Sequence, residues 1–330
     1  MSAATRSAVF GSPEALPSLL RVADVDPALL ATDFAVPPDT ALDHRMREAE
    51  VLVTGWGCPP VDASALRRMP RLRALVHAAG SVKAHVTAAC WERGLVVSSA
   101  AAANAVPVAE YTLAAILFAN KRVLQAAHAY RTDRAPVDLL ARYPDAGNHR
   151  RTVGLVGASL VGRRVLELLR PFDFRVLVHD PYADPAELAA LGAEPCTLEQ
   201  LLRHADVVSL HAPATAETRH LLDAERLALM PDGATLVNTA RGSLVDTGAL
   251  LRELVTGRLN AVLDHTEPEV PPAGSPLFTL PNVLLTPHVA GSLGGELARL
   301  AELAVSEVER YARGLPFRHP VDPRRLARSA

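Results

Sequence analysis

The stretch TVGLVGASLVGRR, residues 152–164, predicts a strand that runs into a tight turn and then into a helix. The turn reads Gly-Ala-Ser-Leu-Val-Gly, from Gly157 to Gly162, so Ser159 stands where the dinucleotide-binding pattern has its middle glycine. A helix that starts at such a turn presents free N–H groups to an anion. The stretch therefore predicts a pyrophosphate cradle in which a serine replaces one glycine.

An acidic residue follows at the distance that this motif requires. The next predicted strand, RVLVHD, ends in Asp180, 18 residues beyond Gly162. A carboxylate in this place accepts hydrogen bonds from an adenosine ribose and repels a 2′-phosphate, which favours NAD over NADP. The alternative is an ordinary packing turn followed by a surface aspartate, and the turn taken alone does not separate the two.

Strands alternate with helices on both sides of this turn. Six apolar, β-branched runs predict strands at 153–156, 175–180, 206–213, 234–240, 261–264 and 282–288. Three earlier runs predict strands at 50–56, 72–80 and 95–100, with helices at 63–70 and 85–94. Alternation of this kind builds parallel sheets with helices on their faces, so we expect an α/β fold.

Longer helical patterns connect and close these units. A helix is expected at 104–131, with Asn104 as its cap and Pro107 in its first turn. It leads into a surface loop that ends near residue 150, where proline, glycine and charges lack periodicity. A last helix is expected at 295–314, with Gly314 placed to end it.

The composition is that of a soluble globular protein, with 49% hydrophobic and 21% charged residues and a net charge of -2. Without a basic excess the chain has no field for a phosphate backbone, which argues against nucleic acid. The most apolar segment, residues 111–119, is too short to span a bilayer, and the three cysteines stand far apart. We therefore expect no membrane partner, no disulfide, no metal site, a small-molecule ligand and a cytoplasmic location.

Three charged residues follow predicted strands, where open α/β sheets bind ligands. They are Arg241, a carboxylate in LDHTEPE at 263–269, and His288. A guanidinium offers a planar fork for the carboxylate of a 2-keto acid, and a histidine can exchange a proton with the carbonyl oxygen. Each of them alone is more often structural than catalytic, and spacing does not decide between these interpretations.

The motifs NTARGSLVD at 238–246, LTPHVAG at 285–291 and NAVPVAEYTLAAIL at 104–117 resemble the NAD-dependent D-2-hydroxyacid dehydrogenase family. The resemblance covers about residues 50–315. It implies two Rossmann-like domains, with a doubly wound parallel-sheet cofactor domain inserted in a smaller flavodoxin-like substrate domain. The substrate domain would comprise residues 1–104 and 291–330, and the NAD-binding domain residues 105–290. It also implies hydride transfer between NAD and a small 2-hydroxy or 2-keto acid, and a homodimer.

The resemblance assigns roles by position. His288 matches the acid/base, Arg241 the substrate-binding arginine and Glu269 the histidine's partner, with Glu267 as a nearby alternative. The cofactor contacts map to Gly157, Ser159, Leu160, Val161, Gly162, Asp180, His211, Ala212, Pro213, Thr218, Thr239, Ala240, Asp264 and Gly291. The substrate contacts map to Trp56, His77, Ala79, Gly80, Ser81 and Asn104.

Some positions depart from the family pattern. Ser159 and Leu160 replace the usual glycine and arginine, and His265 stands where valine is common. Trp56 stands near the position at which phosphoglycerate dehydrogenases carry a phosphate-binding arginine. The altered turn leaves a second hypothesis open, a corepressor-like protein that senses NAD(H) with little turnover. A formate dehydrogenase is disfavoured because a glutamate, rather than a glutamine, is available to the histidine.

Overall fold

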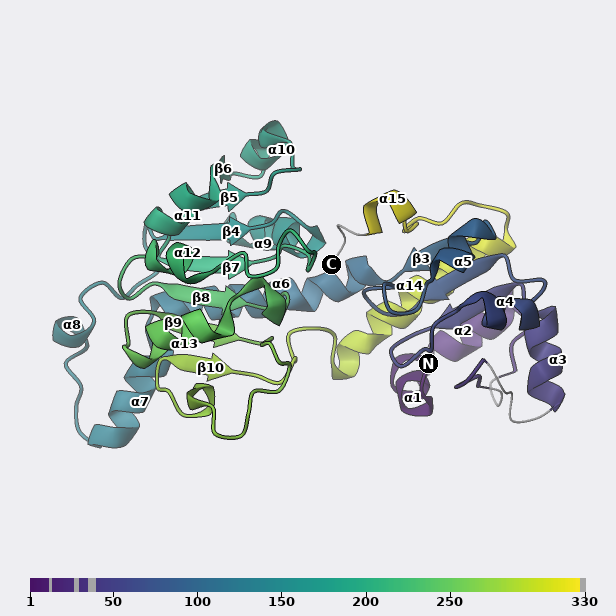
Figure 1. Ribbon diagram of the computed structural model, residues 1–330, viewed down its shortest axis with the longest axis horizontal. Helices are drawn as coiled ribbons and strands as arrows, with labels where there is room; N and C mark the ends of the chain where they lie inside the picture. Colours follow the sequence, from purple (N-terminus) through teal and green to yellow (C-terminus); the bar gives the residue numbers. More distant parts are fainter. Residues whose placement is uncertain (12–13, 27–29, 35–39, 327–330) are drawn as a thin grey trace. The chain divides into compact units, whose positions relative to one another are not determined.

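The computed structural model describes residues 1–11, 14–26, 30–34 and 40–326, and the chain divides into two compact units. The first unit joins Met1–Ala105 to Ser292–Ser329, and the second is Val106–Gly291. Each unit has its own parallel sheet with helices around it (Figure 1). The α/β fold class expected from the sequence is confirmed.

The sheet of the second unit has seven parallel strands in the order β10-β9-β8-β7-β4-β5-β6. They are β4 Thr152–Val156, β5 Arg175–His179, β6 Glu194–Pro195, β7 Val207–Leu210, β8 Thr235–Asn238, β9 Asn260–Leu263 and β10 Val283–Leu285. The order reverses between β4 and β7, so the turn after β4 lies at the switch point where doubly wound sheets bind ligands. The six expected strands are confirmed, whereas β6 was missed because its two exposed residues carry no apolar run.

Neighbouring residues of each strand alternate between two cores, as the period of a strand requires. Leu155 and Val237 belong to one core, and Val156 and Leu236 to the other. The first core also holds residues of α6 Ala101–Asn120, α9 Leu160–Leu169 and α10 Pro185–Ala190. The second holds residues of α11 Leu198–His204, α12 Ala224–Ala228 and α13 Thr247–Val255. The sheet is therefore covered on both faces, which fixes its carboxyl edge as the place left for a ligand.

The helix expected at 104–131 is in fact two helices. After α6, Arg122 takes the left-handed conformation with φ 54°, and its guanidinium donates to the carbonyl oxygen of Gly233 at 2.6 Å. The chain then continues as α7 Val123–Asp133, and α8 Leu139–Arg142 adds one turn inside the expected loop. The break cannot be predicted from local sequence, because Lys121 and Arg122 both favour helix and Gly233 is 111 residues from Arg122 along the chain.

The start of α6 also differs from the expectation. The helix begins at Ala101, so Asn104 is not its cap and Pro107 lies inside it rather than in its first turn. Alanine has the highest helix propensity, and three alanines extend the helix back by a turn. By length and composition this helix is long enough to cross a membrane, contrary to the expectation from residues 111–119. Ala109 and Ile116 nevertheless lie fully buried in the core of the second unit.

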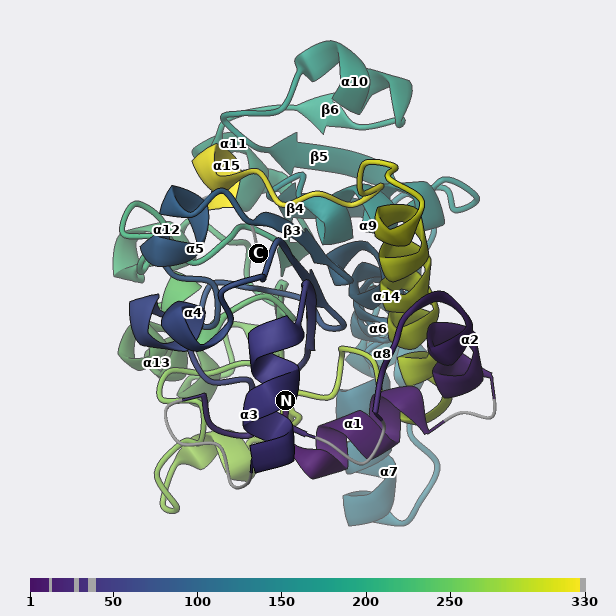
Figure 2. The ribbon, with the colours of Figure 1, turned by 90° about the vertical axis from the view of Figure 1, so that its right-hand side faces the viewer.

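The sheet of the first unit has the order β1-β2-β3, with β1 Val51–Thr54, β2 Ala74–His77 and β3 Val96–Ser99. One face packs against α1 Ala3–Phe10, α2 Ala15–Val22 and α14 Leu297–Ala312, which lie beside one another in Figure 2. The other packs against α3 Thr40–Glu48, α4 Ala63–Arg68 and α5 Ala88–Glu92, and α15 Pro323–Leu326 closes the described chain. The expected strands and the closing helix are confirmed, and Gly314 follows α14 with φ 70°.

Candidate active site

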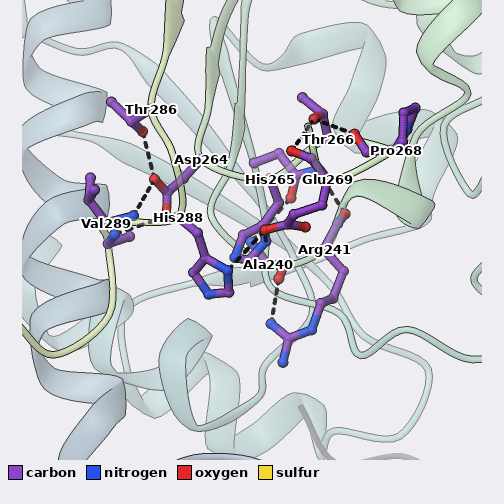
Figure 3. A network of polar contacts seen from close by, with 12 residues as sticks. Ala240, Arg241, Asp264, His265, Thr266, Pro268, Glu269, Thr286, His288 and Val289 are labelled. Carbon is purple, nitrogen blue, oxygen red and sulfur yellow. Dashed lines mark hydrogen bonds and ion pairs between the residues drawn. The ribbon is translucent and has the colours of Figure 1, made fainter. Parts of the chain in front are cut away.

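Three neighbouring strands of the second unit bring the predicted catalytic side chains to one edge of the sheet. Arg241 follows β8, Glu269 follows β9 after a short turn, and His288 follows β10. The strands are parallel and in register, with Leu263 opposite Asn238 on one side and Leu285 on the other. Their carboxyl ends therefore meet, and Figure 3 shows the side chains gathered there.

His288 is fixed by its backbone and by a carboxylate. It takes the left-handed conformation with φ 57°, which is rare outside glycine, and its N–H donates to the carbonyl oxygen of Asp264 at 3.2 Å. Its Nδ1 lies 3.0 Å from Oε1 of Glu269. Because Nδ1 faces the carboxylate, Nε2 is the ring atom left for proton exchange, and the side chain is 57% exposed.

The two candidate partners of His288 are separated by their contacts. Glu267 accepts a hydrogen bond from Nη1 of Arg219 at 2.8 Å and lies 3.4 Å from Nε2 of His220. The Arg219 hydrogen bond lowers the pKa of Glu267. The hydroxyl of Thr266 donates to the carbonyl oxygens of Pro268 and Glu269, which shapes the turn between the two glutamates. Glu269 therefore faces the histidine, and Glu267 belongs to another cluster.

Arg241 leaves the sheet beside this pair. Its Nη1 donates to the carbonyl oxygen of Ala240 at 2.6 Å, and its own carbonyl oxygen accepts from Nδ2 of Asn238 at 2.8 Å. Burial lowers the pKa of the guanidinium, and the nearby Glu269 carboxylate opposes this effect. At Gly242 a Cβ would lie 2.1 Å from the backbone of Thr266, so only glycine allows the two segments to approach so closely.

A second histidine lies in the same cluster. The ring of His265 stands 3.9 Å, centroid to centroid, from the ring of His288, and its Nδ1 is 3.6 Å from Oε1 of Glu269. Burial, then the charges of His288 and Arg241, lower the pKa of His265 to about 4. The sequence marked His265 only as a departure from valine. Its contact with His288 depends on the pairing of β9 with β10, which no local pattern encodes.

The glycine turn has the geometry of an anion cradle. Gly157 has φ 101°, and a Cβ there would lie 2.6 Å from the backbone N of Ala212. At Gly162 a Cβ would lie 2.2 Å from the carbonyl oxygen of Gly157. Ser159, with φ -65°, needs no glycine, and its hydroxyl caps α9 by accepting from the Gly162 N–H. The two retained glycines are thus the two that the backbone requires.

The first turn of α9 leaves donors for a pyrophosphate. Within the described chain, the N–H groups of Leu160 and Val161 donate to no protein acceptor. Asp180 lies beside the turn, since its carboxylate accepts from the N–H groups of Ala158 at 2.7 Å and Tyr182 at 2.8 Å. A carboxylate has further lone pairs for ribose hydroxyls. These residues fit the adenosine end of NAD.

The remaining predicted cofactor residues lie along the same edge of the sheet. His211 and Ala212 pack their backbone against Gly157, and the His211 ring is fully buried, 2.9 Å from the Ser209 hydroxyl. Thr218 donates to the carbonyl oxygen of Pro213 at 2.6 Å. The other members of this set are Thr239, hydrogen-bonded to Thr112, Ala240, Asp264 and Gly291. His211 thus offers its backbone to this edge, whereas its imidazole belongs to the core.

Three of the predicted substrate residues of the first unit, Ala79, Gly80 and Ser81, lie in the loop that follows β2. The N–H groups of Ala79, Gly80 and Ser81 donate to no protein acceptor in the described ranges. Asn104 lies beside Gly80, and its Oδ1 accepts from the N–H of Ser292 at 3.1 Å. Three successive free donors suit a carboxylate.

The other two predicted substrate residues of this unit differ in exposure. The His77 side chain is buried and its Nδ1 lies 2.8 Å from the Thr54 hydroxyl, whereas Trp56 is 39% exposed. His77 therefore lies inside the unit, and only the Trp56 side chain of the two is exposed.

Comparison with known proteins identifies the chain's family. Residues 113–290 match the family of D-isomer specific 2-hydroxyacid dehydrogenases, in its NAD binding domain. The chain belongs to this family. Over 312 residues it is 34% identical to a glyoxylate reductase of Aeropyrum pernix, with 92% of this chain and 90% of that relative covered. A D-3-phosphoglycerate dehydrogenase of Mycobacterium leprae is 35% identical over 78% of this chain but only 48% of its own length.

Solved structures of similar proteins agree with the family. A protein of Thermus thermophilus is 35% identical with a TM-score of 0.69, covering 87% of this chain and 90% of that one. The D-lactate dehydrogenase of Aquifex aeolicus, solved with NAD and lactic acid, is 26% identical with a TM-score of 0.69, covering 92% and 94%. The match to an NAD binding domain and this complex with NAD confirm the expected fold, family and cofactor.

Proposed function

We propose that the protein is an NADH-dependent reductase of a small 2-keto acid such as glyoxylate or hydroxypyruvate, and that it forms the corresponding 2-hydroxy acid, in the D configuration where that product is chiral. The observation that carries the proposal is the 3.0 Å contact between Nδ1 of His288 and Oε1 of Glu269, beside Arg241 on one sheet edge. The proposal assigns His288 as acid/base, Glu269 as its partner and Arg241 as the substrate-binding residue.

Each side chain has a distinct role in this reaction. NADH supplies the hydride. His288 donates a proton from Nε2 to the substrate carbonyl oxygen, and Glu269 holds the ring by Nδ1 and stabilises its protonated form. Arg241 binds the substrate carboxylate and polarises the carbonyl, because burial strengthens the interaction of its guanidinium with an anion.

The two units are proposed to divide the work as the family resemblance implies. The second unit, with the 157–162 turn and Asp180, would hold NAD, and the first unit would bind the substrate carboxylate with the N–H groups of residues 79–81. The glyoxylate reductases, matched at 34% and 32% identity over most of their length, support a small substrate. The homodimer and the cytoplasmic location remain predictions.

A panel of 2-keto acids with NADH tests the proposal. We expect turnover with at least one small keto acid, and we expect His288→Ala to lower kcat by about 10²–10⁴-fold. His204→Ala, on an exposed histidine of α11, is the matched control and should keep the wild-type rate. No turnover with any keto acid, despite NADH binding by calorimetry, would instead favour the NAD-sensing alternative.

A further inference from the structure

The cluster around Glu269 contains one imidazole more than the proposed reaction uses. His265 and His288 both direct Nδ1 at the same carboxylate oxygen, at 3.6 Å and 3.0 Å. The side chain of His265 is 4% exposed, whereas those of Glu269 and His288 are 58% and 57% exposed. The cluster is thus buried at His265 and exposed to solvent at Glu269 and His288.

The fold holds these three side chains in place. His265 follows Asp264 directly at the end of β9, and His288 is fixed in a left-handed conformation after β10. The Thr266 hydroxyl donates to the carbonyl oxygens of Pro268 and Glu269, and the resulting turn directs Glu269 toward the two histidines. Side chains fixed by neighbouring strands have little conformational freedom to lose when they bind a common ligand.

The distances suit a metal ion. A tetrahedral zinc ion with ligands at about 2.1 Å separates its ligand atoms by roughly 3.4 Å, and the two measured separations lie on either side of that value. One ligand atom from each residue can be chosen so that all lie within 4.8 Å of one another. Two histidines and a glutamate form a known zinc donor set, and the open side leaves a position for water.

We propose that His265, Glu269 and His288 bind a divalent transition-metal ion of the zinc class, and that this ion reversibly inhibits the enzyme. The metal takes Nδ1 of His288 and the Glu269 carboxylate, the two groups that hold the acid/base in its working state. The imidazole bound through Nδ1 keeps its Nε2 proton and no longer exchanges it. This proposal differs from the sequence analysis, which expects no metal site.

The neighbouring charges affect how tightly a cation binds, and the ligand types decide which cation binds. The positive Arg241 acts on the same cluster and opposes a cation, while Asp264 acts in the opposite direction. Imidazole ligands favour Zn²⁺, Cu²⁺, Ni²⁺ and Co²⁺, whereas Mg²⁺ and Ca²⁺ require oxygen ligands. We therefore expect inhibition by zinc and none by magnesium at equal concentration.

Binding is tested on the full chain, freed of metal with a chelator, by calorimetry with ZnCl₂. We expect one ion per chain, and we expect His265→Val and His265→Asn each to weaken binding by about tenfold or more. His220→Gln is the matched control, because His220 contacts Glu267 rather than Glu269, and it should bind zinc as the wild type does. Binding that is absent, or equal in wild type and both His265 variants, overturns the proposal.

Two further measurements test metal binding without a variant and test inhibition by zinc. CoCl₂ added to the wild-type chain should give the strong visible absorption of a four-coordinate site, which needs no variant to fold. The inhibition arm rests on the proposed function: with an active keto acid, ZnCl₂ should stop NADH oxidation, a chelator should restore it, and MgCl₂ should leave it unchanged. Zinc binding through His265 without any turnover would refute the proposed function alone, whereas turnover that zinc leaves unchanged would refute the inhibition.

Discussion

The backbone of His288 is tied to Asp264, which is buried and lies on the neighbouring strand end. The N–H of His288 donates to the Asp264 carbonyl oxygen at 3.2 Å. The Asp264 carboxylate accepts from the Thr286 hydroxyl at 2.6 Å, from the Val289 N–H at 2.8 Å and from the Ala290 N–H at 2.9 Å. These bonds hold the residues on both sides of His288, so they maintain its left-handed conformation.

Asp264→Asn should therefore weaken both stability and catalysis. Asparagine has an NH₂ group in place of one carboxylate oxygen, and this group cannot accept a hydrogen bond from a backbone N–H. The N–H left without an acceptor is buried, which costs about 1–3 kcal/mol. We expect a lower free energy of unfolding in urea and a lower kcat with the active keto acid.

Asp223→Asn is the control for this substitution. Asp223 caps α12 by accepting from the Arg226 N–H, and asparagine caps helices as well as aspartate does. Both quantities should stay near the wild-type values in this variant. A full kcat in Asp264→Asn would show that these bonds do not position His288.

The sequence predicts the sheet of the second unit well because its strands are buried on both faces. Runs such as Val207–Leu210, in which only Ser209 is polar, are buried throughout, and largely apolar runs of this length between helices have few other structures. The exposed two-residue β6 carries no such signal. The break at Arg122 depends on the carbonyl oxygen of Gly233, a partner far along the chain. Local sequence therefore predicts what burial determines and misses what distant polar contacts determine.

The candidate site shows the same division. The motifs placed Arg241 and His288 at strand ends, but they left Glu267 and Glu269 as alternatives. The choice depends on the turn at Thr266 and on Arg219, which draws Glu267 away. Side-chain pairing across turns and strands is set by packing and cannot be read from spacing.

Glu269→Gln should lower kcat, whereas Glu267→Gln should leave it unchanged. In Glu269→Gln the amide still accepts from Nδ1 of His288 but carries no charge to stabilise the protonated ring, so we expect kcat to fall at least about tenfold. Glu267→Gln loses only its exposed contacts with Arg219 and His220 and should keep kcat. Steady-state kinetics of both variants check this, and equal kcat values would contradict the assignment.

Gly157→Ala and Ser159→Gly test which residues of the turn the cofactor needs. A Cβ at residue 157, with φ 101°, meets the backbone of Ala212 at 2.6 Å, so the turn must move. We expect at least about tenfold weaker NADH binding by calorimetry and a lower melting temperature.

Ser159→Gly restores the usual motif and removes only the cap on α9. Replacing a serine cap by glycine costs a few tenths of a kcal/mol, and the backbone at φ -65° stays accessible, so about the same NADH affinity is expected. A large gain in affinity would mean that the Ser159 side chain obstructs the pyrophosphate.

The buried histidines of the two units should make stability depend on pH. Burial lowers the pKa of His211 to about 3 and that of His77 to about 3, from an ordinary value of 6.5. Between these values the unfolded chain binds more protons than the folded chain, so the free energy of unfolding falls as the pH falls from 6.5 toward 3. The stabilisation is fully present above pH 6.5.

Replacing either histidine by glutamine should reduce this dependence. Urea unfolding of wild type, His211→Gln and His77→Gln across pH 4–7.5 measures the slope of the free energy of unfolding against pH. Each variant should lose part of the slope below pH 6.5, and the double variant more, because each removes one group that the unfolded chain protonates and the folded chain does not. The change in slope separates this effect from the loss of the contacts with Ser209 and Thr54, which shifts the whole curve at every pH. Parallel curves for wild type and variants would show that these histidines bind protons equally in the folded and the unfolded chain.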